Sequence, residues 1–238
     1  MKNKTMAGAG FLLGLIPKSL LFLLICDLFY LQQIWPNWEE LAAGKVPVSG
    51  FMWAYLGDNR SAEEMSPLKW QPVPLSRIPA SVQQAFIVAE DGRFYRHSGL
   101  DWTAVENAFQ SNLRLRSARY GASTISQQTV KNLFLSPSRT LLRKWHEMIL
   151  TRAMEQNLGK RRILEIYLNI AQLGQGIFGV QAAAAAYWGK PVFRLTAHQG
   201  AELAATLPSP ATDNPTSRTT AFLRRTADIS RKLEQIRR

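Results

Sequence analysis

Two patterns of apolar residues divide the chain. Near the N-terminus one apolar run extends from Phe11 to Trp35, interrupted by Lys18 and Asp27. Because a helix needs about 20 apolar residues to cross a hydrocarbon core, this run predicts a transmembrane helix. From Ala80 onward the apolar positions recur every three or four residues, which is the period of amphipathic helices. Almost nothing in that region alternates with period two, so its fold class is predicted to be mostly α.

The helical periodicity also locates the elements. It predicts one helix from Ala80 and another after an N-cap at Asp101. Further helices are predicted at 124–134, 140–157, 162–172, 180–187, 196–207 and 215–236. Residues 37–79, which are rich in Trp and Pro, predict an irregular connector with one short strand around Phe51–Tyr55. The chain is therefore divided into residues 1–36, with the anchor, a connector at 37–79 and a helical domain at 80–238.

The net charge narrows the choice of partners. Lys and Arg number 29 against 17 Asp and Glu, a formal charge of +12. Such a balance indicates an anionic partner, which can be nucleic acid, membrane headgroups or a phosphorylated substrate. The single cysteine, Cys26, excludes an intrachain disulfide.

The flanks of the apolar run predict its orientation. Lys2 and Lys4 precede it, so the positive-inside rule keeps the N-terminus cytoplasmic and places the rest of the chain outside. The alternatives are a cleaved signal peptide and a buried core helix. No clear small-x-small cleavage site closely follows the run, which favours an uncleaved anchor. An anchored domain outside the cytoplasm has no access to nucleic acid.

The stretch GASTISQQTVKN, residues 121–132, carries more polar groups than a helix start needs. Thr124 and Gln127 fit a capping box, in which each side chain satisfies a backbone amide. Gln128 and Lys131 share another face of the same helix. A solvated surface is one interpretation of that face, and a binding site is the other.

Glu90 follows a strongly apolar helical turn that includes Phe86, and aromatic residues come soon after it. A carboxylate held against apolar neighbours is poorly solvated, so the pKa of Glu90 is expected to rise toward the range useful for proton transfer. The structural alternatives nearby are a cap at Asp91 and ordinary loop packing at His97.

A third polar segment is SRTLLRKWHEMIL, residues 138–150. Arg139, Arg143 and Glu147 recur every four residues and are expected to line one helical face. A surface ladder of ion pairs is the structural alternative, worth a few tenths of a kcal/mol per pair. Two facing arginines repel each other, however, and with Lys144 and Lys131 they would form a good clamp for a pyrophosphate.

In order and spacing, four segments resemble the motifs of the peptidoglycan glycosyltransferases. EDGRFYRHSG is similar to ED-x-x-F-x-x-H-x-G, and GASTISQQTVKNL to G-x-S-T-I-x-Q-Q-x-x-K-N. RKWHE is similar to R-K-x-x-E, and KRRILEIYLN to K-x-x-I-L-E-x-Y-L-N. The resemblance spans about residues 79–210, and the chain ends soon after it, which favours the monofunctional biosynthetic type.

The resemblance implies a lysozyme-like helical lobe and a smaller membrane-associated jaw lobe at about 112–140. It implies polymerisation of lipid II into β-1,4-linked glycan strands, with inversion and release of undecaprenyl pyrophosphate. The expected partners are lipid II, the nascent strand, the membrane and cell-wall synthesis or division proteins. The expected location is the bacterial inner membrane, with a single-pass anchor and the catalytic domain in the periplasm.

The motifs also carry roles for particular residues. Glu90 would deprotonate the acceptor hydroxyl, and Glu147 would assist departure of the pyrophosphate directly or through a divalent cation such as Mg²⁺. The residues expected to bind phosphates or sugars are Ser123, Thr124, Gln127, Gln128, Lys131, Asn132, Arg139, Arg143 and Lys144. Asp91, Phe94 and His97 would support the Glu90 loop. No organic cofactor is expected, and the sequence itself contains no evident metal-ligand cluster.

Two other functions fit part of the pattern. A lysozyme-like glycan-cleaving enzyme, such as a lytic transglycosylase, also uses one glutamate in a helical lobe, but it has no pyrophosphate for the basic residues to bind. A non-catalytic cell-wall scaffold would use the same cleft only for binding. The presence of both Glu90 and Glu147 argues against it.

Overall fold

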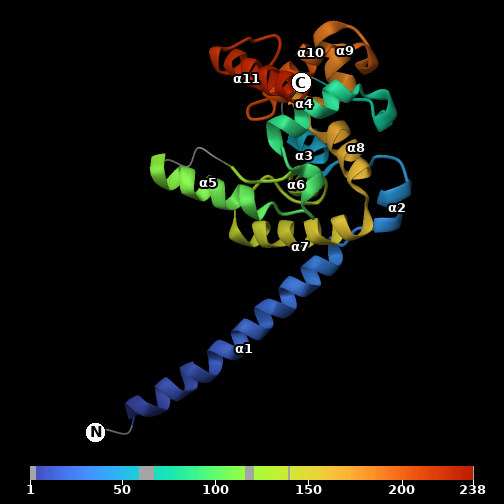
Figure 1. The fold of residues 1–238 in the computed structure, drawn as a ribbon. Helices are drawn as coiled ribbons and strands as arrows, with labels where there is room; N and C mark the ends of the chain where they lie inside the picture. The colour runs from blue at the N-terminus through green and yellow to red at the C-terminus, as the bar shows by residue number, and fades with distance from the viewer. Residues whose placement is uncertain (1–3, 59–66, 116–120, 139, 238) are drawn as a thin grey trace. The chain divides into compact units, whose positions relative to one another are not determined.

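The structure is a computed structural model that describes residues 4–58, 67–115, 121–138 and 140–237 (Figure 1). The chain forms two compact units, residues 1–37 and residues 38–238. The boundaries predicted at residues 36 and 79 stay predictions. The jaw lobe at 112–140 also stays a prediction. It includes residues 116–120 and 139, which lie outside the described residues.

The first unit consists mainly of one helix, α1, which runs over Lys4–Gln33. Large apolar side chains are exposed along its second half, from Leu20 to Tyr30. Among the described residues, no helix combines the length and the hydropathy of a membrane span. The predicted apolar run lies almost entirely within helix α1. Whether this helix crosses a membrane stays a prediction.

The second unit is built around buried contacts between helices. At one end α10 (Ala197–Thr206) packs against both α4 (Ala80–Glu90) and α11 (Thr220–Arg237). At the other, α6 (Ile125–Phe134) packs against α7 (Leu141–Asn157) and α8 (Lys160–Ile170). Figure 1 shows α8 extending from the α7 side of the unit toward α4. The helical fold class predicted from the periodicity is confirmed.

A short three-stranded sheet joins the C-terminal end of α8 to the rest of the unit. Its order is β1 (Lys69–Trp70), β3 (Ile177–Phe178), β2 (Gln172–Gly174), with β1 parallel and β2 antiparallel to β3. The sequence did not predict it, because strands of two or three residues are too short to alternate visibly.

Asn169, at the end of α8, fixes the segment that enters this sheet. Its side chain accepts from the Val73 amide at 2.8 Å and donates to the Val73 carbonyl at 2.8 Å. Its backbone carbonyl accepts from Trp70 Nε1 at 2.9 Å. Asn169 is fully buried, so its polar groups cannot bond to water and need these partners within the protein.

The strand predicted around Phe51–Tyr55 is wrong. This segment is helix α3, Gly50–Asp58, and it follows the short helix α2, Trp38–Ala43. The Ser49 hydroxyl accepts from the Met52 amide at 3.2 Å and so caps the helix start. A serine that precedes a continuous apolar run is an N-cap signal, and here it outweighs the β-propensity of the aromatic residues.

The remaining predicted helices are confirmed, with shifts at their ends. They include α5 (Trp102–Leu115), capped by Asp101, and α9 (Val180–Trp188). Three short 3₁₀ helices are also described: η2 (Leu75–Arg77), η3 (Phe94–Arg96) and η4 (Val192–Arg194). Helix α11 begins five residues later than predicted. The Asn214 side chain accepts from the amides of Thr216 and Ser217, which closes a turn and delays the helix start to the Thr219 cap.

Gly179, before α9, provides a test of this packing. Its φ is +79°, and a Cβ there would lie 2.5 Å from the Asn169 carbonyl oxygen. We expect Gly179→Ala to lower the free energy of unfolding by about 3 kcal/mol, because backbone strain and a backbone clash add together. Gly189→Ala is the matched control, since Gly189 also has positive φ but open space around it, and should cost about 1 kcal/mol. Chemical denaturation measures both, and equal losses would contradict the clash.

Candidate active site

Glu90 is the last residue of α4, and each of its carboxylate oxygens has a donor. Arg225 Nη2 on α11 lies 2.6 Å from Oε1, and Gln128 Nε2 on α6 lies 2.8 Å from Oε2. The carboxylate is therefore held between two helices that are far apart in the sequence.

Burial raises the pKa of the Glu90 carboxyl above its ordinary value of 4.5. The hydrogen bond from Gln128 and the charges of Arg225 and Lys131 lower it, and burial outweighs them. This agrees with the direction expected from the apolar residues that precede Glu90. A carboxylate with a raised pKa is a stronger base, and as long as it stays ionised it can accept a proton.

Gln128 lies between Glu90 and the interior. Its side-chain oxygen accepts from the Tyr167 hydroxyl on α8 at 3.2 Å, while its nitrogen donates to Glu90. The residue predicted to bind substrate thus holds the predicted base by a direct hydrogen bond.

Glu147, on α7, lies in a cationic environment. It is only 2% exposed, and Arg143 Nη1 lies 2.5 Å from its Oε2. Lys144 Nζ forms an ion pair with the other oxygen. Both oxygens of Glu147 are thus neutralised by residues of its own helix.

The helical face predicted for Arg139, Arg143 and Glu147 needs a correction. Helix α7 starts at Leu141 after an N-cap at Thr140, so position 139 precedes the helix. Only Arg143 and Glu147 have the predicted i,i+4 relation. Arg139 itself lies outside the described residues.

Lys131 links the two carboxylates electrostatically. Burial lowers its pKa, the charges of Glu147 and Glu90 raise it, and those of Arg143 and Lys144 lower it further. Its ammonium group also lies 5.7 Å from the centre of the Phe51 ring on α3. The charges of both glutamates thus act on one buried lysine side chain.

A cavity of about 210 Å³ opens beside Glu90. Glu90 forms part of its wall, and residues 121–124 form another part. Lys144 Nζ lies 3.5 Å from the hydroxyl of Ser123, which also lines this cavity. The cavity therefore reaches from the predicted base toward the cationic group, although Lys131 and Glu147 do not line it.

Three other predicted binding residues are buried, and two of them have structural hydrogen bonds. Thr124 and Gln127 form the predicted capping box, with both bonds at 3.1 Å, and the Thr124 hydroxyl donates to the Gly99 carbonyl at 2.6 Å. Asn132 is buried on the same helix. The polar groups of Thr124 and Gln127 are thus already used inside the protein.

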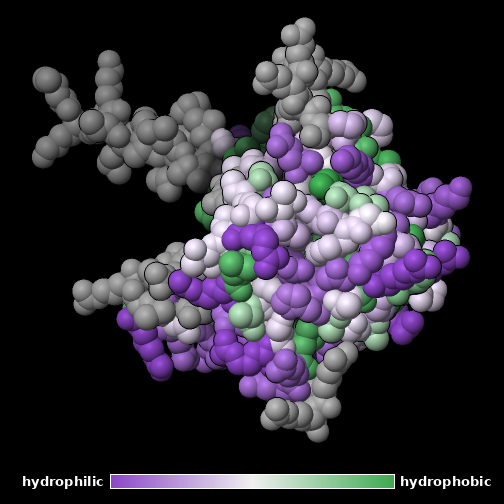
Figure 2. Space-filling view, turned by 90° about the horizontal axis from the view of Figure 1, so that it is seen from above, coloured by the Kyte–Doolittle hydropathy of each residue, from purple (hydrophilic) through white to green (hydrophobic). Residues whose placement is uncertain are grey.

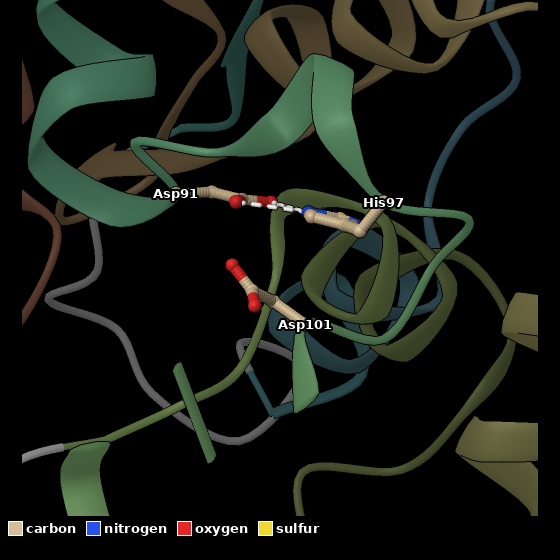
Figure 3. Close-up of side chains that lie close together, drawn as sticks. All are labelled: Asp91, His97 and Asp101. Carbon is tan, nitrogen blue, oxygen red and sulfur yellow. Dashed lines mark hydrogen bonds and ion pairs between the residues drawn. The ribbon is translucent and has the colours of Figure 1, made fainter. Parts of the chain in front are cut away.

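The loop after Glu90 is fixed by Asp91 and His97 (Figure 3). His97 Nε2 lies 3.0 Å from both oxygens of Asp91, and one of these oxygens also accepts from the Ile125 amide at 3.0 Å. The Gly99 amide donates to His97 Nδ1 at 3.2 Å, so Nε2 carries the hydrogen that faces Asp91. Phe94 is fully buried, with Lys160 Nζ 4.4 Å from the centre of its ring.

The side chains described here do not fit a divalent cation. Asp91, His97 and Asp101 lie close enough together to share one (Figure 3), but His97 Nε2 is bonded to Asp91, and Asp101 caps α5 and pairs with Arg93. A histidine ligand must present an unprotonated nitrogen, whereas Nε2 is a donor and Nδ1 is an acceptor for Gly99. At Glu147, Arg143 and Lys144 already occupy both oxygens, and their charge would repel a metal ion.

Arg225 was missed in the sequence analysis, although a signal existed. Phe222, Ile229 and Leu233 form the buried stripe of α11, and Arg225 lies three residues after the first and four before the second. An arginine on the buried face of an amphipathic helix indicates a buried anionic partner. The sequence alone does not say which carboxylate it meets.

Comparisons with known proteins identify the family of this chain. The family described as transglycosylase matches residues 58–234. The chain belongs to that family. It is 38% identical to the "Biosynthetic peptidoglycan transglycosylase" of Herminiimonas arsenicoxydans over 92% of each chain. It is 40% identical to the protein of that name from Bordetella pertussis over 79% of each, and 48% identical to that of Rhodospirillum centenum over 70% of this chain and 71% of the other. The family predicted from the four motifs is thereby confirmed.

Proposed function

We propose that this transglycosylase is a peptidoglycan glycosyltransferase that polymerises lipid II into β-1,4-linked strands. The observation that carries the proposal is the pairing of two unlike glutamates. Glu90 is a partly buried carboxylate with a raised pKa, and Glu147 has a cation at each oxygen. Lys131 interacts with both. Glu90 suits proton transfer, and the cations around Glu147 suit an anionic leaving group.

In the proposed reaction the 4-hydroxyl of the acceptor GlcNAc attacks C1 of the donor MurNAc. The new C1–O bond forms as the bond from C1 to the pyrophosphate breaks, and the anomeric centre is inverted. Glu90 takes the hydroxyl proton, and undecaprenyl pyrophosphate leaves with the bonding electrons. Glu90 ends α4 beside the cavity, where an acceptor hydroxyl can approach it.

The cations act on the departing pyrophosphate. Negative charge accumulates there as the bond breaks, so fixed positive groups stabilise the transition state more than the bound substrate. Lys144 is the most accessible of the Glu147 partners, and its ammonium group already approaches the cavity at Ser123. One such donor is commonly worth about 3 kcal/mol, or roughly a hundredfold in rate.

Glu147 acts on this step through Arg143 and Lys144. It forms an ion pair with each, which keeps two long side chains in place before the substrate arrives. A preorganised cation needs little rearrangement when charge develops on the substrate. No step of the proposal passes through a metal ion, and the predicted role of Mg²⁺ is left to the chelator experiment below.

We also propose that the protein is anchored in the inner membrane, with its catalytic unit in the periplasm. The apolar side chains exposed on α1 support this location. Further large apolar side chains are exposed on α5 and at the start of α7; they are Trp102, Val105, Phe109, Leu113, Leu141, Leu142 and Trp145. By contrast, the face in Figure 2 is mostly hydrophilic, with scattered apolar residues. The apolar surfaces of α5 and α7 suit contact with lipid, where lipid II is found.

Labelled lipid II tests the activity. The purified full chain should convert it into glycan strands, and Glu90→Gln should slow this by at least a hundredfold because the amide cannot accept the proton. Glu234→Gln, on the exposed side of α11, is the control and should keep the wild-type rate. Gel separation of the products measures strand formation, with and without chelator.

The outcomes of that assay separate the candidate functions. Fragments released from finished glycan, with no strands made from lipid II, would instead support a cleaving enzyme. Full activity of Glu90→Gln would remove Glu90 from the proposed role. A scaffold would show neither polymerisation nor cleavage.

The pH dependence should report the environment of Glu90. Because the ionised carboxylate is the base and burial raises its pKa, the rate should fall on the acidic side at a pH above 4.5. Arg225 lowers this pKa, so Arg225→Met should move the acidic limb to higher pH, by up to about one unit for a partly exposed pair. Arg224→Met changes the exposed neighbour and should leave the limb in place. An unmoved limb in Arg225→Met would contradict the assignment.

Extraction from membranes tests the anchor. The full chain should resist alkaline carbonate, whereas a chain that starts at residue 37 should be released by it, because only a spanning helix has its apolar surface enclosed in lipid. Immunoblotting of the membrane and supernatant fractions measures both. Release of the full chain would contradict a spanning anchor.

A further inference from the structure

Tyr167 lies in the middle of α8 and is fully buried. Its ring packs edge-on against Phe86 of α4, with 6.3 Å between the ring centres. In the part of the chain that the structure describes, its hydroxyl has one hydrogen-bond partner, Gln128 Oε1 at 3.2 Å. Tyr167 belongs to the KRRILEIYLN segment, but it was not among the predicted site residues.

The hydroxyl of Tyr167 stays protonated over the working range of the enzyme. Burial raises its pKa well above the ordinary value of 10.0, and the charge of Glu90 raises it further. A buried hydroxyl hydrogen needs an acceptor, because leaving it unpaired costs its full desolvation. Gln128 Oε1 is that acceptor.

The orientation of the Gln128 amide follows from both of its neighbours. An ionised carboxylate can only accept, so the side of the amide that faces Glu90 must be its NH₂ group. The oxygen then faces Tyr167, whose hydroxyl donates to it. The two contacts therefore require the same orientation of the amide.

We propose that Tyr167 is a positioning residue for Glu90, because its hydroxyl holds the Gln128 amide with the NH₂ group toward the carboxylate. This inference rests on the proposed role of Glu90 as the base. Tyr167 touches neither the cavity nor the substrate in that role. It acts through Gln128 alone.

The opposite orientation of Gln128 matches a protonated Glu90. In that state the acid group donates to Oε1, the NH₂ group faces Tyr167, and the tyrosine hydrogen loses its acceptor. The hydroxyl thus disfavours the arrangement that suits the protonated acid. The charged groups that also act on Glu90 are Arg225 from α11 and Lys131 from α6, and both favour the ionised form.

Tyr167→Phe removes the hydroxyl and keeps the ring. We expect the acidic limb of the kcat/KM profile to move to higher pH by about one unit. This is the size of shift expected when one hydrogen bond that favours the ionised form is lost. The rate should return toward the wild-type value at higher pH, where Glu90 is ionised again. Tyr187→Phe is the matched control: its hydroxyl donates to the Leu173 carbonyl at 2.5 Å and is not bonded to the Glu90 network.

Gln128→Met removes the amide that transmits the effect. It should move the limb in the same direction, and adding Tyr167→Phe to it should then produce no further shift, because the second residue acts only through the first. Additive shifts would overturn the proposal. So would a Tyr167→Phe limb equal to that of the wild type, or a rate loss that is the same at every pH.

Two further results keep the inference separate from the proposed function. If Glu90→Gln is fully active, the base assignment fails and this inference fails with it. If Glu90→Gln is inactive and Tyr167→Phe retains the wild-type limb, the function stands and only the positioning role is wrong. Thermal unfolding monitors folding, and if Tyr167→Phe does not fold, an unmoved limb in Gln128→Met overturns the proposal.

Discussion

The site depends on keeping a carboxylate ionised where water cannot fully solvate it. Burial at the end of α4 raises the pKa of Glu90, and only the donors brought by α6 and α11 oppose that effect. Without them the pKa of Glu90 would rise further, and the carboxyl group would ionise only at higher pH. The packing of α4 against α10 and α11, and of α6 against α8, is therefore required for the electrostatics of one side chain as well as for stability.

The two glutamates show how environment separates the roles of identical side chains. Glu90 has one cation and one neutral amide as partners, whereas Glu147 has two cations from its own helix. In the proposed reaction the first arrangement suits a base, and the second holds cations for the departing pyrophosphate. Lys131 lies within reach of both charges, so a change at one glutamate should be felt at the other.

Local features of this site could be predicted from the sequence, and long-range ones could not. The capping box at Thr124 and the rise in the pKa of Glu90 follow from residues a few positions apart, and both were predicted correctly. The Glu90–Arg225 pair joins residues 135 positions apart. Nothing in the periodicity of α11 says which buried acid its inward arginine meets. The error at 51–55 was local: the aromatic residues there favour a strand, whereas the Ser49 cap starts a helix.

Chemical and structural residues alternate within the motifs themselves. In the stretch 121–132, Thr124 and Gln127 close the helix start, whereas Gln128, the next residue, bonds to Glu90. Asp91, next to Glu90, bonds to His97 and to the Ile125 amide. This alternation has a physical reason: a carboxylate can be positioned to a few tenths of an ångström only if the backbone that carries it is fixed by bonds of its own. A polar residue in such a motif is therefore as much a part of the scaffold as of the chemistry, and only its contacts decide between the two.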